Sequence, residues 1–255
     1  MKRLGSYWRL VPFQLFAGNP VSSTCPDDRQ HVRRPRLGKQ VGTALAAWFF
    51  ALTLSAGASA QLAPGKDYQL INPPQPTNSG TKIEVIEFFY YGCPGCNSLQ
   101  PPLRAWLKKK PADVEFRSAP VVFQDAWLPL TTAYYAFDAM GLVDKLHDDL
   151  YSAIHDRRTL EIKGLLRESK PLFDWVAQQG VDRQKFVDVF NSFGVRSRTN
   201  RSIELPGNYH VTSTPTLVVD GKYLTTPAMA GSYERFFQVL DQVIAMARKE
   251  RAAKK

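Results

Sequence analysis

The chain has 255 residues, a length that fits one large domain or two of ordinary size. A hydrophobic content of 44% and a charged content of 22% exclude a wholly disordered or fibrous protein. The net charge of +10 suggests a nucleic acid or an anionic surface as a partner, and three cysteines are too few for a disulfide scaffold.

The first sixty residues contain the parts of an export signal. Basic residues gather at 33–39, an apolar run extends from 41 to about 54, and Ala58-Ser59-Ala60 supplies the small residues that precede a cleavage site. The apolar run is shorter than the ~20 residues that span a bilayer. We therefore predict a signal peptide cleaved after Ala60, in preference to an uncleaved anchor.

The signal lies far from the first residue of the chain. One hypothesis is that translation starts near Val32 through a non-ATG codon, so that residues 1–31 reflect a misassigned start; a long natural leader is the alternative. Without residues 1–60 the chain loses eight basic residues, two acidic residues and Cys25. The remaining 195 residues carry a net charge of +4, so most of the positive charge belongs to the leader and we expect no nucleic-acid partner.

The next segments predict a strand–helix–strand unit. Residues 61–81 are rich in proline and predict an extended lead-in with one short strand at 68–71. Residues 82–89 are β-branched and aromatic, which indicates a buried strand. A helix is expected over 94–110, because proline is tolerated in the first turn, and 114–122 predicts a second core strand.

Helical periodicity replaces the strand pattern from about 130 to 209. Predicted helices cover 131–140, 142–156, 172–179 and 183–193, with breaks at glycines and at Pro171. A strand follows at 216–219, Asp220-Gly221 predicts a hairpin to 222–225, and a helix is expected at 232–249. This order predicts an α/β domain over 82–255 that is interrupted by an all-helical insertion at about 130–209.

Cys93-Pro94-Gly95-Cys96 lies directly after the predicted buried strand and opens the helix. The N–H groups and partial positive charge of a helix N-terminus stabilise a thiolate. We therefore predict that Cys93, at the cap, is the nucleophile and that Cys96, one turn later, is the resolving thiol. A structural disulfide, a metal site and two incidental buried thiols are the alternatives. A structural disulfide is disfavoured because it would close only a short loop, and a metal site because the sequence has no second cysteine pair. Incidental thiols would not explain the placement of the motif between a strand and a helix.

Thr214-Pro215 opens the strand predicted at 216–219. Proline is allowed at the first position of a core strand because its missing N–H costs little there. A cis-proline beside the cysteines, with neighbouring backbone free to pair with an extended substrate, is the functional interpretation. An ordinary trans-proline is the alternative, and it is favoured on frequency because only about 5–6% of X–Pro bonds are cis.

These motifs together resemble the DsbA-type thiol:disulfide interchange proteins of the thioredoxin fold. The residues that carry the resemblance are Glu87-Phe88-Phe89, Cys93-Pro94-Gly95-Cys96 and Thr214-Pro215. The resemblance extends over roughly 61–249, and the helical block matches the insertion that separates this family from plain thioredoxin. It implies a thioredoxin-like fold with an inserted all-helical domain.

The resemblance also implies roles for single residues. Pro215 is expected to be cis, and Thr214 to line a hydrophobic peptide groove beside Cys93. Glu87 is expected to lie beneath the disulfide and to assist proton transfer with the buried cysteine, whereas the strand pattern alone leaves a solvent-facing Glu87 equally open. The best-known members carry histidine where this chain has Gly95, so we expect a less oxidising cysteine pair here.

By this resemblance the protein is an exported, periplasmic oxidant that donates its Cys93–Cys96 disulfide to extended, reduced, newly translocated polypeptides. A membrane reoxidase of the DsbB type is expected to restore the disulfide. We expect no metal, nucleotide or organic cofactor besides that redox-active disulfide, and a monomer. A periplasmic disulfide isomerase or reductase of the same fold is one alternative, and a peptide-binding chaperone is another.

Overall fold

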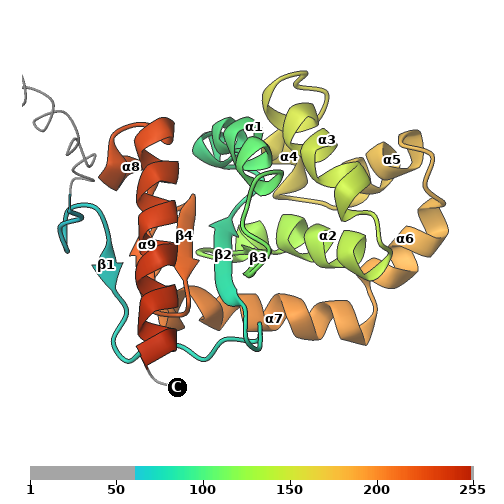
Figure 1. The fold of residues 1–255 in the computed structure, drawn as a ribbon. Coiled ribbons are helices and arrows are strands. Elements are labelled where there is room, and N and C mark those ends of the chain that lie inside the picture. Colours follow the sequence, from blue (N-terminus) through green and yellow to red (C-terminus); the bar gives the residue numbers. More distant parts are fainter. Residues whose placement is uncertain (1–60, 254–255) are drawn as a thin grey trace, which may run out of the picture. The chain divides into compact units, whose positions relative to one another are not determined.

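The structure, a computed structural model, describes residues 61–253 (Figure 1). The expected signal peptide, its cleavage after Ala60, the start near Val32 and Cys25 lie outside the described residues. No helix within 61–253 combines the length and the apolar character needed to cross a membrane.

A mixed sheet of five strands organises this part of the chain, in the order β1-β5-β4-β2-β3. The central strand β2 (Ile83–Phe89) has all seven of its residues buried, as its β-branched and aromatic composition predicts. It runs parallel to β3 (Val114–Pro120) and antiparallel to β4 (Thr216–Val219). Helix α1 (Pro94–Leu107) makes the crossover between β2 and β3.

A tight hairpin joins β4 to β5 (Tyr223–Thr225), and β5 pairs with the short β1 (Gln69–Leu70). Asp220 and Gly221 both have a positive φ, 55° and 64°, which is the backbone of the turn that this residue pair predicts. The predicted hairpin is therefore confirmed.

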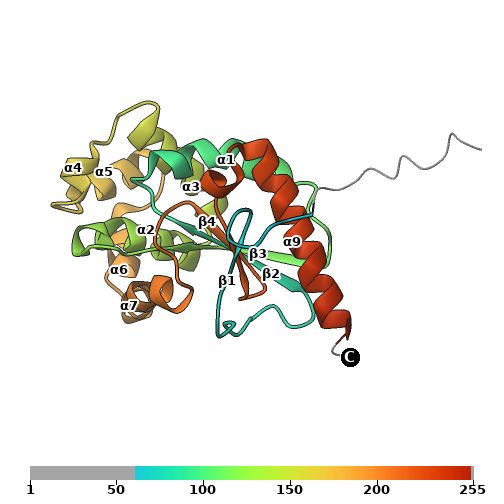
Figure 2. The same ribbon diagram turned by 90° about the vertical axis from the view of Figure 1, so that its left-hand side faces the viewer.

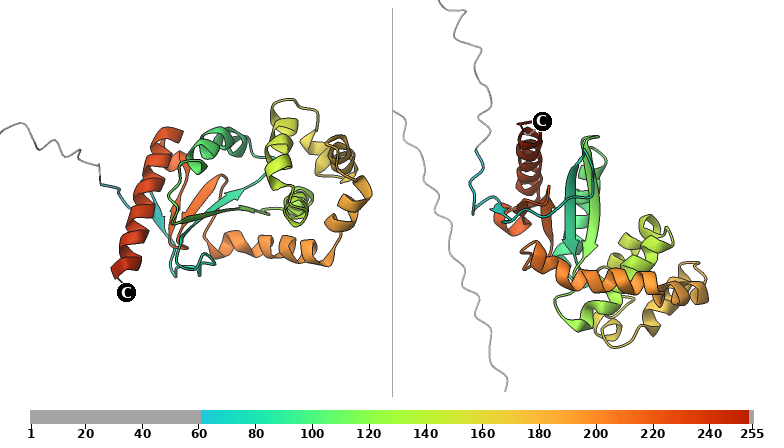
Figure 3. Two further views of the ribbon diagram at one scale, coloured as in Figure 1. Left: turned by 45° about the vertical axis from the view of Figure 1, so that its right-hand side comes forward. Right: turned by 90° about the horizontal axis from the view of Figure 1, so that it is seen from below.

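Helices cover both faces of the sheet. Val85, Leu217 and Val219 share a hydrophobic cluster with residues of α1 and of the long C-terminal helix α9 (Tyr233–Ala253). Helix α9 follows the short α8 (Pro227–Ala230) and runs alongside the sheet (Figure 2). The intervening residues Ile86, Phe88 and Val218 belong to a second hydrophobic cluster, which continues into the helical block. Alternate residues of one strand thus serve two cores. In Figure 3 the sheet lies between α9 and that block.

The helical block follows a single turn of 3₁₀ helix at Asp125–Trp127. Its helices are α2 (Leu128–Ala139), α3 (Val143–His155), α4 (Ile162–Leu165), α5 (Lys170–Gln178), α6 (Arg183–Phe190) and α7 (Phe193–Asn208). The chain is thus an α/β protein of thioredoxin-like fold with inserted helices.

The helix predicted over 183–193 begins at Arg183 as expected but ends at Phe190. The break predicted at Gly194 is wrong, because α7 begins at Phe193 and continues through Gly194. Ser192 caps α7 by accepting a hydrogen bond from the backbone N–H of Val195 (3.3 Å). Gly194 and Pro206 indicate breaks by propensity, yet both lie within α7. Packing outweighs propensity here: α7 lies against α2, with the hydroxyl oxygens of Tyr135 and Ser202 2.6 Å apart.

We predict that Gly221→Ala destabilises the fold more than Gly180→Ala. Both glycines have a positive φ, but a Cβ on Gly221 would overlap the carbonyl oxygen of Gln75, whereas a Cβ on Gly180 would meet open space. Urea unfolding should show a loss of about 1 kcal/mol for Gly180→Ala and about 3 kcal/mol for Gly221→Ala. Equal losses would contradict the close approach at the hairpin.

Candidate active site

Cys93 lies where β2 gives way to α1. It is the N-cap residue of α1, with an extended backbone (φ −87°, ψ 115°), and its Sγ accepts a hydrogen bond from the N–H of Cys96 (3.4 Å). Cys93 is half-buried and Cys96 is fully buried, so one sulfur is accessible and the other is enclosed. Both are free thiols, so the structure represents the reduced protein.

The pKa values of the two thiols are shifted in opposite directions. A hydrogen bond from the Cys96 side chain is the main cause that lowers the pKa of Cys93 from 9.0 to about 5. Burial opposes this shift, and the side chain of Thr214 and the backbone N–H groups of Cys96 and Gly95 assist it. Burial raises the pKa of Cys96 well above its ordinary value. At neutral pH the pair can therefore hold a thiolate on the accessible sulfur and a proton on the enclosed one.

Thr214 and Pro215 reach the cysteines from a distant part of the sequence. The Thr214–Pro215 peptide bond is cis, the geometry that the family resemblance implies. The Cys93 thiol donates to the backbone oxygen of Thr214 (3.3 Å). The structure thus brings this loop directly against Cys93, beside the start of β4.

Gly95 permits close packing between the helix start and this loop. A Cβ on Gly95 would lie 3.3 Å from Cδ of Pro215 and 3.7 Å from Sγ of Cys93. The carbonyl oxygen of Gly95 accepts a hydrogen bond from the hydroxyl of Tyr233 (3.2 Å), which ties the motif to α9. Pro94, the first residue of α1, is exposed.

Glu87 is completely buried, so the solvent-facing alternative is wrong. Its Oε1 accepts from Nε2 of Gln100 (3.1 Å) and its Oε2 from Oγ of Ser118 (2.9 Å), and both donors are uncharged. Gln100 follows Cys96 by one helical turn, and its Nε2 also lies 3.5 Å from the Cys96 carbonyl oxygen. Burial raises the pKa of Glu87 from 4.5 to about 7, although the two hydrogen bonds oppose the rise.

A cavity of about 330 Å³ leads to this carboxyl group. Its lining includes Glu87, Gln100, Arg104, Ser118 and His147. Water in such a cavity would give Glu87 a route for proton exchange. Within residues 61–253, no group of three or more His, Cys, Asp or Glu side chains is arranged to hold a metal ion.

Sequence reasoning missed several residues that surround the motif. They are Gln100 and Ser118 beside Glu87, Tyr233 on Gly95, and His147 and His155 on Tyr91. The spacing of one turn after Cys96 could have indicated Gln100. Ser118 lies opposite Glu87 in the β2–β3 register, which the sequence pattern alone does not supply.

Comparison with known proteins finds extended similarity. The thiol:disulfide interchange protein DsbA of Burkholderia cepacia is 38% identical over 207 residues, covering 81% of this chain and 95% of that protein. The protein of the same name from Pseudomonas aeruginosa PAO1 is 35% identical over 191 residues, covering 75% and 87%. No family model matches the chain.

Solved structures give the same result. The crystal structure of Pseudomonas aeruginosa DsbA superposes with a TM-score of 0.68 at 33% identity, over 76% of this chain and 97% of that one. The oxidoreductase DsbA from Xylella fastidiosa gives a TM-score of 0.68 at 30% identity, over 74% and 98%. The similarity therefore covers nearly all of each of these structures.

The raised pKa of Glu87 predicts a pH dependence of stability. Between about pH 4.5 and 7 the folded state holds a proton that the unfolded state has released, so stability falls as the pH rises through this window. The fall is about 3 kcal/mol, and Glu87→Gln should remove it, because glutamine does not titrate. Urea unfolding of both proteins at several pH values tests this; parallel curves would contradict it.

We also predict that the reduced protein shows thiolate absorbance with a midpoint near pH 5, set by Cys93. This transition should disappear in Cys93→Ser, because the pKa of the buried Cys96 lies well above its ordinary value. A parent protein that titrates near pH 9 instead would show that the helix start does not stabilise the thiolate.

Proposed function

Because this chain belongs to the DsbA family of thiol:disulfide interchange proteins, we propose that it donates a Cys93–Cys96 disulfide to reduced polypeptides after their export. It is a thiol:disulfide oxidoreductase of thioredoxin fold, and its chemistry is dithiol–disulfide exchange. The observation that carries the assignment of roles is the contrast between the accessible Cys93, whose pKa is lowered, and the enclosed Cys96, whose pKa is raised.

The exchange proceeds in two displacements. A substrate thiolate attacks Sγ of Cys93, a substrate–Cys93 bond forms, and the Cys93–Cys96 bond breaks with its electron pair moving to Cys96, which takes up a proton. A second substrate thiolate then attacks the substrate sulfur and releases Cys93 as a thiolate. Two electrons enter the protein; one of the two substrate protons ends on Cys96 and the other goes to solvent.

The surroundings of the motif suit each step. Cys93 is a good leaving group because its thiolate is stabilised at the start of α1. Glu87 has a pKa of about 7, so near neutral pH it is able both to hold and to release a proton. It is linked through Gln100 to the helical turn that carries Cys96, which supports a role in the proton transfer.

The loop of Thr214 and Pro215 supplies the binding surface in this proposal. The carbonyl of Thr214 reaches Cys93, so an extended substrate segment that pairs with this backbone would present its sulfur to the same atom. The chain would return to the oxidised state by passing two electrons to a membrane reoxidase of the DsbB type. We further propose a monomer, without cofactor, in the periplasm, exported by the signal that precedes Gln61.

Substitutions at the two cysteines test the proposal. Cys93→Ser should abolish oxidation of a reduced model protein, because no sulfur remains at the accessible position. Cys96→Ser has no disulfide to donate, so it should also fail to oxidise the reduced protein; when its Cys93 thiolate attacks a disulfide-bonded substrate, the mixed disulfide should accumulate, because no second thiol of the protein can release Cys93. Acid trapping and non-reducing electrophoresis measure both results, and Ser98→Ala, an exposed change on α1, is the matched control.

The redox state of the parent protein in cells separates oxidant from isomerase or reductase. An oxidant should be trapped mainly as the disulfide, because its reoxidase keeps it oxidised. A pool that is mainly reduced would overturn the proposed direction of exchange while leaving the exchange chemistry intact.

A further inference from the structure

A four-residue turn delivers the chain from β2 to Cys93. The backbone N–H of Cys93 donates to the carbonyl oxygen of Tyr90 (3.0 Å), so Tyr91 and Gly92 occupy the middle of the turn. The peptide unit between these two residues has two possible orientations, and a flip from one to the other gives its second residue a positive φ. Glycine accepts either orientation with little penalty.

Packing explains why glycine stands at this position. A Cβ on Gly92 would overlap the ring of Tyr90 and would lie 3.0 Å from Cδ1 of Ile162. Gly92 does not have a positive φ, so the turn adopts the orientation that an ordinary residue also prefers. The glycine that the packing requires nevertheless leaves the flipped turn accessible, and Cys93 is the next residue.

His155 acts on the peptide unit that would flip. Its Nε2 lies 2.7 Å from the carbonyl oxygen of Tyr91, and because a carbonyl only accepts, Nε2 carries the hydrogen. Rotation of the central peptide would carry this oxygen away from the ring and break the bond. His155 is half-buried at the last position of α3, so its ring is held by the insertion rather than by the turn itself.

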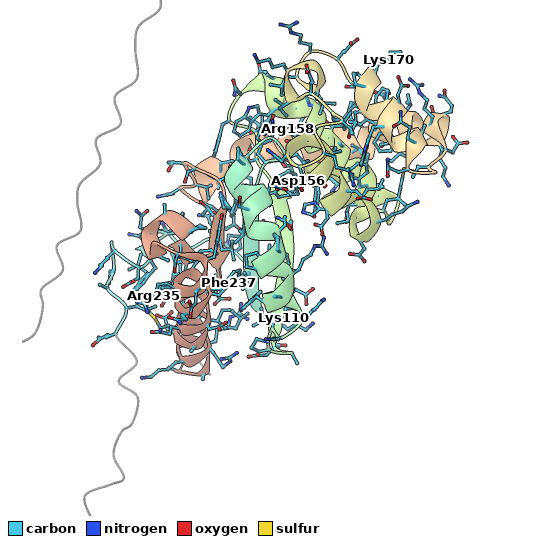
Figure 4. The ribbon with its side chains drawn as sticks, turned by 90° about the horizontal axis from the view of Figure 1, so that it is seen from above. Lys110, Asp156, Arg158, Lys170, Arg235 and Phe237 are labelled. Carbon is cyan, nitrogen blue, oxygen red and sulfur yellow. The ribbon has the colours of Figure 1, made fainter. Side chains whose placement is uncertain are left out.

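One face of α3 contacts both the side-chain hydroxyl and the backbone carbonyl of Tyr91. His147, two turns before His155, has its Nδ1 2.9 Å from the hydroxyl of Tyr91, and the ring of Tyr151 lies between them at a centroid distance of 4.9 Å from the Tyr91 ring. A further contact follows α3, where Oδ1 of Asp156 accepts from Nδ2 of Asn97 in α1 (3.1 Å). Figure 4 shows Asp156 and Arg158 near the start of α1.

We propose that His155 is a positioning residue for the exchange reaction, whose hydrogen bond to the Tyr91 carbonyl holds the turn and keeps Cys93 at the cap of α1. The donors that stabilise the Cys93 thiolate are then aligned before a substrate arrives, and no ordering of the turn is needed at each displacement. The inference rests on the proposed function in one respect, namely that Cys93 is the attacked and attacking sulfur.

Two substitutions of His155 test the proposal. His155→Leu removes the donor, and it should raise the pKa of the Cys93 thiolate and slow exchange with a model disulfide by roughly three- to tenfold, the effect of one ordinary hydrogen bond. His155→Gln should restore most of both values, because the amide nitrogen of glutamine lies about as far along the side chain as Nε2 of histidine. The measurements are thiolate absorbance against pH and stopped-flow exchange rates.

Tyr91→Phe is the matched control. It removes the hydroxyl that contacts His147, so it should lower stability in urea, because a buried ring nitrogen loses its partner. It should shift the thiolate titration and the exchange rate less than His155→Leu does, because the hydrogen bond from His155 to the Tyr91 carbonyl remains. Titration shifts of equal size in Tyr91→Phe and His155→Leu would overturn the proposal. So would a leucine variant that behaves as the parent, or a glutamine variant that behaves as leucine.

The proposed function fails separately from this inference. A parent protein that does not oxidise reduced polypeptides would defeat the proposed function, whereas the effect of His155 on the thiolate absorbance of Cys93 would still be measurable in the same protein.

Discussion

The chemistry of this protein depends on the placement of one sulfur at the N-terminus of a helix. Unpaired N–H groups at that end of α1 favour a negative charge, and the N–H of Cys96 already contacts Sγ of Cys93. The sheet serves this arrangement because β2 ends at Phe89 and sets where α1 can start. The cis-proline loop contacts Sγ of Cys93, and Gln100 connects the buried Glu87 to the carbonyl oxygen of Cys96. From the helical insertion, His155 contacts the carbonyl oxygen of Tyr91, two residues before Cys93.

Glu87 shows how strongly the environment of the site departs from that of water. A carboxyl group in the centre of a sheet would usually be paired with a cation, but here two uncharged groups, from Gln100 and Ser118, supply its hydrogen bonds. Burial therefore prevails, and the pKa of Glu87 rises to about 7. The buried carboxylate lowers the stability of the folded state at neutral pH, and the two extensive hydrophobic cores offset this loss. The raised pKa also lets Glu87 exchange its proton near neutral pH.

Local patterns in the sequence carry the strand–cysteine–helix order and the Asp220-Gly221 hairpin, because turn chemistry and burial act over a few residues. Helix α7 could not be predicted from local patterns, because Gly194 and Pro206 disfavour a helix there. Its contacts with α2 and the Ser192 cap stabilise it instead. The contact between Glu87 and Ser118 could not be predicted either, because it depends on the register of β2 against β3. His155 lies 64 residues from Tyr91, and no periodicity links the two.

The contact between Cys93 and Thr214 joins residues separated by 121 positions. Every residue of the helical insertion lies between them in the sequence. The loop of Thr214 and Pro215 therefore reaches Cys93 only after β4 has paired with β2. The helix cap is local and can form early, whereas contacts of such separation form slowly. During folding, the helix start that carries Cys93 is therefore expected to form before the Thr214 loop reaches the sulfur. A thiol that this loop does not yet cover can exchange with any disulfide that it meets, so fast folding limits side reactions of Cys93.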